Sequence, residues 1–188
     1  MTENGLREWL SEAERIDRAL YGAINSTPTP LLDRAMPALS RAADHSKLWI
    51  ATGALLAVAG GRRGRLAAAS GLASVAATSV VANLIVKPIG RRRRPDRSAE
   101  QIPLQRQVKM PGSRSFPSGH AASATAFAAG TGRVLPAVGV PLHCLAALVG
   151  YSRVHTGVHY PGDVVAGVVA GGVIADFVAS LTSRRLYA

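Results

Sequence analysis

The chain has 188 residues, 48% of them apolar, with one cysteine and a formal net charge of +11. This length indicates one domain, the apolar content excludes a disordered chain, and the lone cysteine excludes an internal disulfide framework. The excess of positive charge is compatible with a polyanionic partner such as nucleic acid. It is equally compatible with basic residues that flank membrane segments or bind a small phosphate. The positions of the charges along the chain distinguish these alternatives.

Residues 1–46 are predicted to form a separate N-terminal segment of amphipathic helices. Apolar residues recur there at three- and four-residue steps and predict an amphipathic helix over residues 5–24. A short second helix is expected between residue 30 and residue 46, after a loop. We expect this segment to lie on a membrane surface, with a soluble helix that caps a bundle as the alternative. The apolar stripe consists of Leu6, Trp9, Leu10, Ala13, Ile16, Leu20 and Ile24.

From residue 47 onward, apolar segments alternate with polar ones. Residues 66–86 carry no charge and would span about 31 Å as a helix, which matches a membrane hydrocarbon core. The Ala and Gly content suits close contact between helices in lipid. The predicted fold is therefore all-α: a multi-pass transmembrane bundle of about five spans over residues 47–188, with a soluble all-α bundle as the alternative. The predicted spans are residues 48–61, 66–86, 118–132, 134–150 and 164–181.

Two polar stretches, residues 87–116 and 152–162, are separated by two of the predicted spans. They are therefore expected on the same side of the membrane. Lys87, Arg94 and Arg153 supply fixed positive charge in or beside these stretches, and an arginine side chain matches phosphate oxygens two at a time. Ser118-Gly119 lies where a loop turns into a helix, a place where backbone N–H groups bind anions. Together these groups would stabilise a phosphoryl group in its transition state.

Two histidines and a carboxylate complete this set. Phosphoryl transfer through a histidine needs one imidazole to attack phosphorus and a second to protonate the leaving oxygen. Asp163 follows His159 by four residues across Pro161-Gly162. We expect Asp163 to begin the last span and to accept a hydrogen bond from His159, which would fix the imidazole tautomer. His120 is then left as the general acid.

These residues fall into three clusters, at residues 87–95, 116–120 and 152–163. The clusters resemble the signature of the type 2 phosphatidic acid phosphatases, the membrane branch of the superfamily that also holds vanadium haloperoxidases. The pattern is Lys-x6-Arg-Pro, then Pro-Ser-Gly-His, then Ser-Arg-x5-His-x3-Asp, and the chain matches it at every motif position. The resemblance implies a helical bundle that hydrolyses a lipid phosphate without a metal or other cofactor. It also implies that His159 is the nucleophile, His120 the acid and Asp163 the orienting group. The implied phosphate-binding residues are Lys87, Arg94, Ser118, Gly119 and Arg153.

Several other charged residues are interpreted without a catalytic role. Arg91, Arg92 and Arg93 are taken as a solvated or headgroup-binding patch. His143 is taken as structural, and His155 as a residue that touches substrate or faces water. Zinc binding is poorly supported, because the chain lacks a typical ligand set. Asp176, an acid within a predicted span, is expected to make a hydrogen bond between helices deep in the bundle.

Three functions from different classes compete at this point. The first is a lipid phosphatase, the second a soluble haloperoxidase-like oxidant, and the third a non-enzymatic membrane protein that binds anionic lipid or nucleic acid. The high content of Ala, Arg and Gly indicates a GC-rich bacterial genome and favours a polyprenyl carrier of the cell envelope as substrate, including decaprenylphosphoryl-phosphoribose. Phosphatidylglycerol phosphate and phosphatidate are the alternatives.

We expect location in a bacterial plasma membrane, no nucleic-acid partner and, as a possibility, a homo-oligomer. The side of the membrane on which the site lies stays open. Family resemblance favours the outside, whereas the distribution of basic residues favours the cytoplasm.

Overall fold

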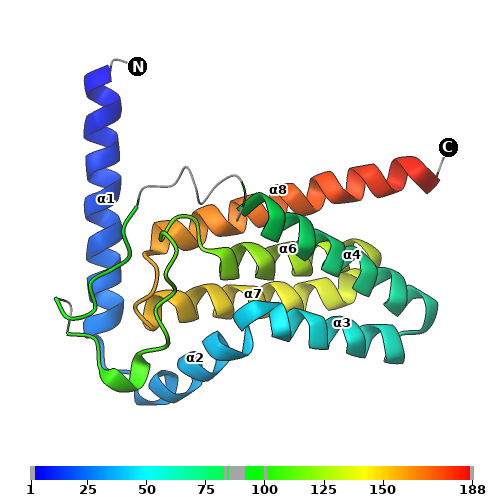
Figure 1. The fold of residues 1–188 in the computed structure, drawn as a ribbon, viewed down its shortest axis with the longest axis horizontal. Coiled ribbons are helices and arrows are strands. Elements are labelled where there is room, and N and C mark those ends of the chain that lie inside the picture. The colour runs from blue at the N-terminus through cyan, green and yellow to red at the C-terminus, as the bar shows by residue number, and fades with distance from the viewer. Residues whose placement is uncertain (1–2, 83, 85–91, 100, 187–188) are drawn as a thin grey trace.

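The computed structural model describes residues 3–82, 84, 92–99 and 101–186, and the regular structure within these ranges is helical, without a strand. This confirms the all-α prediction. Most of the helices run roughly along the long axis of the molecule and form a bundle, and α1 is set across one end of it (Figure 1). In chain order the elements are α1 (Glu3–Ser26), α2 (Pro30–Ala42), the 3-10 turn η1 (Asp44–Ser46), α3 (Lys47–Ala59), α4 (Gly61–Val81), the 3-10 turn η3 (Leu104–Arg106), α6 (Gly119–Val134), α7 (Pro136–His155) and α8 (Pro161–Leu186).

Helix α6 forms the centre of the bundle and packs against α4, α7 and α8. Its Phe127 is completely buried and lies 5.4 Å, ring centroid to ring centroid, from Trp49 of α3. Most other inward residues of α6 are alanines, which bring little bulk between the helices. The small side chains therefore allow three helices to surround α6 closely, as the sequence predicted.

The contact between α8 and α6 depends on glycine. A Cβ atom added to Gly171 would lie 2.2 Å from the backbone oxygen of Ala122, and one added to Gly167 would lie 2.5 Å from that of Ser118. Neither distance is tolerated by real side chains, so these positions require glycine if the helices are to touch. This close approach brings the start of α8 beside the start of α6, where the predicted site residues lie.

Three of the described helices are long and apolar enough to cross a membrane: α4, α7 and the Pro161–Leu181 part of α8. Helices α3 and α6 have 13 and 16 residues, or about 20 Å and 24 Å, and are shorter than a hydrocarbon core of about 30 Å. The number of about five spans thus stays a prediction for these two helices. The end of the predicted span 66–86, at residues 83 and 85–86, lies outside the described residues.

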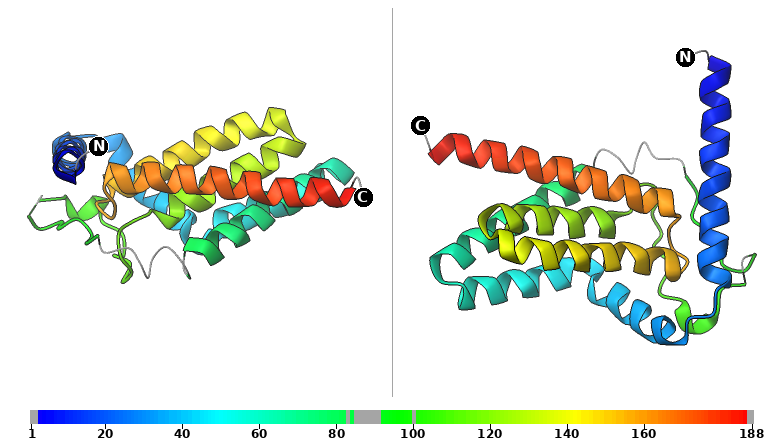
Figure 2. Two further views of the ribbon diagram at one scale, coloured as in Figure 1. Left: turned by 90° about the horizontal axis from the view of Figure 1, so that it is seen from above. Right: turned by 180° about the vertical axis from the view of Figure 1, so that it is seen from behind.

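Helix α1 is amphipathic, as the sequence predicted, and it buries a carboxylate that the sequence did not single out. Its apolar stripe is exposed, with Trp9 at 61% and Leu10 at 52%, whereas Asp17, Tyr21 and Asn25 are buried against the rest of the protein. Two further views show that α1 meets the bundle through its C-terminal half only (Figure 2). A soluble capping helix would bury its apolar stripe. This helix exposes most of its apolar stripe, whereas Asp17, Tyr21 and Asn25 face the protein and Ile24 packs beside Tyr21.

The packing of α8 on α6 generates a prediction with an adjacent control. Gly171→Ala is expected to destabilise the protein by about 1–3 kcal/mol, because a backbone oxygen cannot move aside cheaply. Gly172→Ala is the matched control, since nothing lies within 4 Å of a Cβ atom at that position. The measurement is thermal unfolding in detergent. Equal melting temperatures for the two variants would contradict the proposed helix contact.

Candidate active site

Most of the residues that the sequence singled out lie together at one end of the bundle. Ser118 is the N-cap of α6, Arg153 occupies the last turn of α7, and His159 and Asp163 lie in the following turn and at the start of α8. Arg94 reaches this end from the long segment between α4 and α6. Lys87 lies outside the described residues, so its expected role as a phosphate ligand stays a prediction.

His159 is buried and has a distinct partner on each ring nitrogen. Its Nε2 lies 3.2 Å from Nη1 of Arg94, and its Nδ1 lies 3.5 Å from Oδ2 of Asp163. Arginine can only donate, so the arrangement favours the tautomer with the proton on Nδ1 and a lone pair on Nε2. Burial lowers the pKa of His159 to about 4, although Asp163 opposes this shift. At neutral pH the imidazole is therefore neutral and nucleophilic.

Asp163 is completely buried, and its carboxylate is surrounded by donors. Besides facing His159, Oδ2 accepts hydrogen bonds from the Ser115 hydroxyl at 2.5 Å and the Tyr160 backbone N–H at 2.9 Å. Oδ1 accepts from Nη1 of Arg92 at 2.9 Å. These partners fix the carboxylate in the place that sequence reasoning assigned to it, behind Nδ1 of His159.

Arg94 is held by backbone carbonyl groups. Its guanidinium donates to the oxygens of Ser113 and Val158, each at 2.8 Å, and more weakly to that of Arg114. These contacts fix the position of the guanidinium, and an anion that binds it has to replace one of its present acceptors. Arg94 thus places a positive charge directly in front of Nε2 of His159.

The start of α6 contributes differently from the way the sequence suggested. The Ser118 hydroxyl accepts from the Ala121 N–H at 3.4 Å, and the Ser118 N–H donates to the backbone oxygen of Asp163 at 2.9 Å. Ser118 therefore caps α6 and ties it to α8. The next two N–H groups, those of Gly119 and His120, have no carbonyl partner within the helix and can bind an anion.

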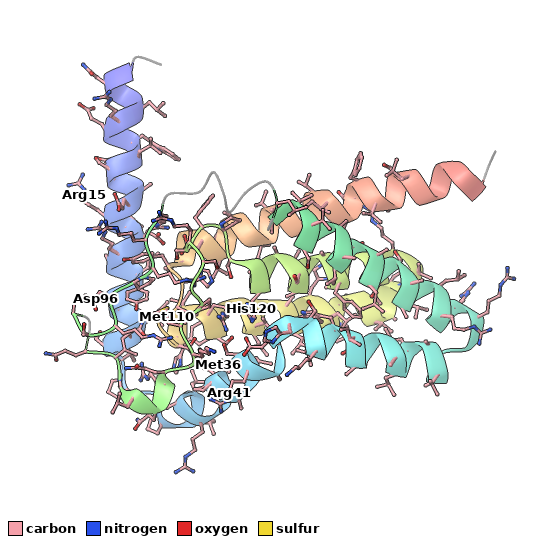
Figure 3. The ribbon with its side chains drawn as sticks, in the orientation of Figure 1. Arg15, Met36, Arg41, Asp96, Met110 and His120 are labelled. Atoms are coloured by element: carbon pink, nitrogen blue, oxygen red, sulfur yellow. The ribbon has the colours of Figure 1, made fainter. Side chains whose placement is uncertain are left out.

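His120 has a carboxylate partner that the sequence did not indicate. Its Nε2 lies 2.8 Å from Oδ1 of Asp44, which also lies 4.0 Å from Nη1 of the buried Arg153. Arg153 forms a further hydrogen bond with Ser40. His120 lies between the start of α6 and the junction of α2 with α3, beside a cavity of about 250 Å³ (Figure 3). Asp44 and Ser40 belong to the N-terminal segment, which contains none of the motifs.

Two interpretations from the sequence are wrong. Arg92 is not a solvated patch residue, because it forms ion pairs with Asp163 and, at 2.5 Å, with Asp17 of α1. His155 does not face water. It is completely buried and lies 3.3 Å from Oδ1 of Asp33, which also pairs with Arg106 at 2.7 Å. This second buried cluster connects α2, η3 and the end of α7.

The structure agrees with the interpretation of His143 and agrees in part with that of Asp176. His143 contacts the backbone oxygen of Gly139 in its own helix, which fits a structural role. Asp176 does join α8 to α6, through Arg133, but the pair is exposed on the protein surface rather than deep in the bundle. Neither residue lies at the end of the bundle that holds the candidate site.

The arrangement as a whole suits phosphoryl transfer. A neutral histidine is oriented by a buried carboxylate, two fixed guanidinium groups and a helix start supply positive charge, and a second histidine stands beside them. Groups of this kind stabilise the charge on the equatorial oxygens of a transferred phosphoryl group while a nucleophile attacks. The sequence pattern identified the pair of His159 and Asp163 and two arginines, Arg94 and Arg153. It did not identify the contributions of Arg92, Ser115, Asp44 and Asp17.

Comparisons with known proteins show the family of the chain. The chain is 34% identical over 182 residues to decaprenylphosphoryl-5-phosphoribose phosphatase from Mycobacterium tuberculosis, covering 92% of this chain and 96% of that protein. Two crystal structures share the fold, each with a TM-score of 0.69 and 24% identity. Aquifex aeolicus LpxE matches over 86% of this chain and 93% of its own. A PAP2 type phosphatidylglycerolphosphate phosphatase from Bacillus subtilis matches over 92% and 87%. A family model described as the PAP2 superfamily matches residues 67–187, so the chain belongs to the PAP2 superfamily.

Proposed function

We propose that this protein is a membrane lipid phosphatase that works through a phosphohistidine on His159. The observation that carries the proposal is the pairing of His159, whose Nε2 faces Arg94 while Nδ1 faces the buried Asp163. An imidazole held in this way has its lone pair directed at the place where Arg94 would hold a phosphate.

In the first step, Nε2 of His159 attacks phosphorus and the bond from phosphorus to the lipid-side oxygen breaks. His120 donates a proton to that leaving oxygen. Arg94, Arg153 and the N–H groups at the start of α6 stabilise the oxygens of the transferred phosphoryl group, with Lys87 as an expected further ligand. Asp163 stabilises the positive charge that develops on the His159 ring.

In the second step, water attacks the phosphohistidine. His120, which has lost its proton, accepts one from this water, and the bond from phosphorus to Nε2 breaks. Inorganic phosphate and the original His159 are released. The Asp44 carboxylate lies 2.8 Å from Nε2 of His120 and would hold this ring in position while it gives and takes the proton.

The substrate we propose is a phosphate carried on a polyprenyl-linked sugar, as in decaprenylphosphoryl-5-phosphoribose. The mycobacterial relative named for that substrate aligns with nearly the whole chain, which supports a similar substrate here. Phosphatidylglycerol phosphate and phosphatidate are the competing substrates. Phosphate release from a panel of these lipids by the purified protein in detergent distinguishes them. Equal rates on all of them would contradict the polyprenyl assignment.

We further propose how the chain sits in its membrane. Residues 47–188 form the embedded core in a bacterial plasma membrane, and residues 1–46 form an interfacial segment. This arrangement is supported by the three long apolar helices and by the exposed apolar stripe of α1, which lies across the bundle rather than along it. We propose no nucleic-acid partner, because Arg92, Arg94 and Arg153 face inward and contact other groups of the candidate active site.

Substitution of the two histidines should give different results. His159→Ala is expected to abolish turnover and any covalent phosphoenzyme, since the nucleophile is lost. His120→Ala should slow the reaction of a lipid alcohol ester by about 10²–10⁴-fold. The same substitution should affect an aryl phosphate far less, because its leaving oxygen barely needs a proton. Rapid-quench labelling with ³²P substrate measures both effects. Acid-labile label on the His159 variant would contradict the assignment.

Removal of divalent metal ions should leave the reaction intact. The charge that stabilises the transition state is expected to come from Arg94, Arg153 and the start of α6, so EDTA should not lower the rate. A metal-dependent phosphatase, assayed in the same detergent solution, serves as the control that loses activity. A rate that falls with EDTA and returns only when Mg²⁺ or Zn²⁺ is added would refute a metal-free mechanism.

A further inference from the structure

We propose that Asp17 of α1 is a positioning residue of the active site, which acts through Arg92 on the carboxylate that orients His159. The inference rests on the proposed function, because it assigns a role in the same reaction. It makes the N-terminal helix part of the catalytic apparatus, although residues 1–46 contain none of the sequence motifs.

The two oxygens of the Asp17 carboxylate have different partners. Oδ1 accepts a hydrogen bond from the backbone N–H of Gly162 at 2.6 Å, in the first turn of α8. Oδ2 accepts from Nη2 of Arg92 at 2.5 Å. A carboxylate at a helix start binds an N–H group that has no partner within the helix and interacts favourably with the helix dipole. Asp17 thereby fixes the start of the helix that contains Asp163.

Arg92 transmits this contact to the site. One of its terminal nitrogens binds Asp17 and the other binds Asp163, while the guanidinium lies 4.3 Å from the centroid of the Tyr160 ring. Only a planar guanidinium can bridge two carboxylates in this way, and lysine would offer a single point of charge. The result is a row of alternating charges, Asp17, Arg92 and Asp163, that ends beside the ring of His159.

The burial pattern of α1 supports a role beyond attachment. Helix α1 buries one aromatic side chain, Tyr21, against Ile102 and Val154, but it exposes most of its apolar stripe and buries the carboxylate of Asp17 with 8% exposure. Burying a carboxylate is costly unless it is paired. The structure satisfies this requirement with Arg92 and Gly162, both directly linked to the site.

A purely structural tie and a positioning role differ in their effect on the charge of His159. That ring is faced by Asp163 from α8, by Arg94 from the long connecting segment, by Arg153 from α7 and by His120 from α6. Asp17 partly neutralises Arg92. Removing the charge of Asp17 should therefore lower the pKa of His159, whereas removing the charge of Arg92 should raise it.

The test uses the full-length protein in detergent and compares Asp17→Asn with Arg92→Gln on one lipid phosphate, so that titration of the substrate is common to both. Each variant should lose about tenfold to a hundredfold in kcat with little change in KM, as expected for a small displacement of a reacting group. The acidic limb of the pH profile of kcat/KM should move to lower pH in Asp17→Asn and to higher pH in Arg92→Gln. A general loss of structure would not produce opposite shifts.

Two further variants complete the design. Asp17→Glu keeps the charge and should restore the acidic limb to its wild-type position. Glu14→Gln removes an exposed carboxylate of the same helix that pairs with Arg18, and it should leave kcat and the pH profile unchanged. If Asp17→Asn fails to fold, Asp17→Glu and Arg92→Gln still carry the test: the proposal requires a wild-type acidic limb for the first and a shift to higher pH for the second.

The inference would be overturned if Asp17→Asn matched Glu14→Gln, or if both charge-removing variants moved the acidic limb in the same direction. A lowered melting temperature with an unchanged pH profile would mean that Asp17 is only a structural tie. Failure of the proposed function is a separate result: the wild-type protein would then release no phosphate, or His159→Ala would retain activity.

Discussion

The candidate site depends on the buried carboxylate of Asp163. A buried carboxylate is stable only if hydrogen bonds or opposite charges replace its lost hydration. Here the replacement comes from Arg92, the Ser115 hydroxyl, the Tyr160 N–H and the ring of His159. Each of these groups comes from a segment that has to be in place for the carboxylate to be satisfied, so the same interaction that orients His159 also organises the end of the bundle.

The bundle makes this arrangement possible through its small residues. Gly167 and Gly171 allow α8 to touch the backbone of α6, and the N–H of Ser118 can then reach the carbonyl oxygen of Asp163. The anion-binding start of α6 and the start of α8 are thereby held side by side. Packing between helices thus sets the distance between the proposed phosphate site and the proposed nucleophile, His159.

Local pattern and motif spacing were sufficient for the parts of the site that lie close in sequence. The spacing of His159 and Asp163 indicated their contact, and the alternation of apolar and polar segments indicated that the arginines and histidines share one end. The contacts of Arg92 with Asp17 and of His120 with Asp44 join residues 75 and 76 positions apart. No periodicity records such pairs, because they depend on how α1 and η1 pack. The apolar stripe of α1 predicted the helix, but it did not predict the burial of Asp17 and Asn25 on another face of the same helix.

The most direct test of this account is the chemical position of the phosphate on the trapped intermediate. The contacts of His159 favour a proton on Nδ1 and a lone pair on Nε2, with Asp163 behind the ring and Arg94 in front of it. Quenching the enzyme during turnover and identifying the isomer by peptide mass spectrometry and ³¹P NMR should show phosphate on Nε2 of His159. Phosphate on Nδ1 of His159, or on His120, would contradict the account.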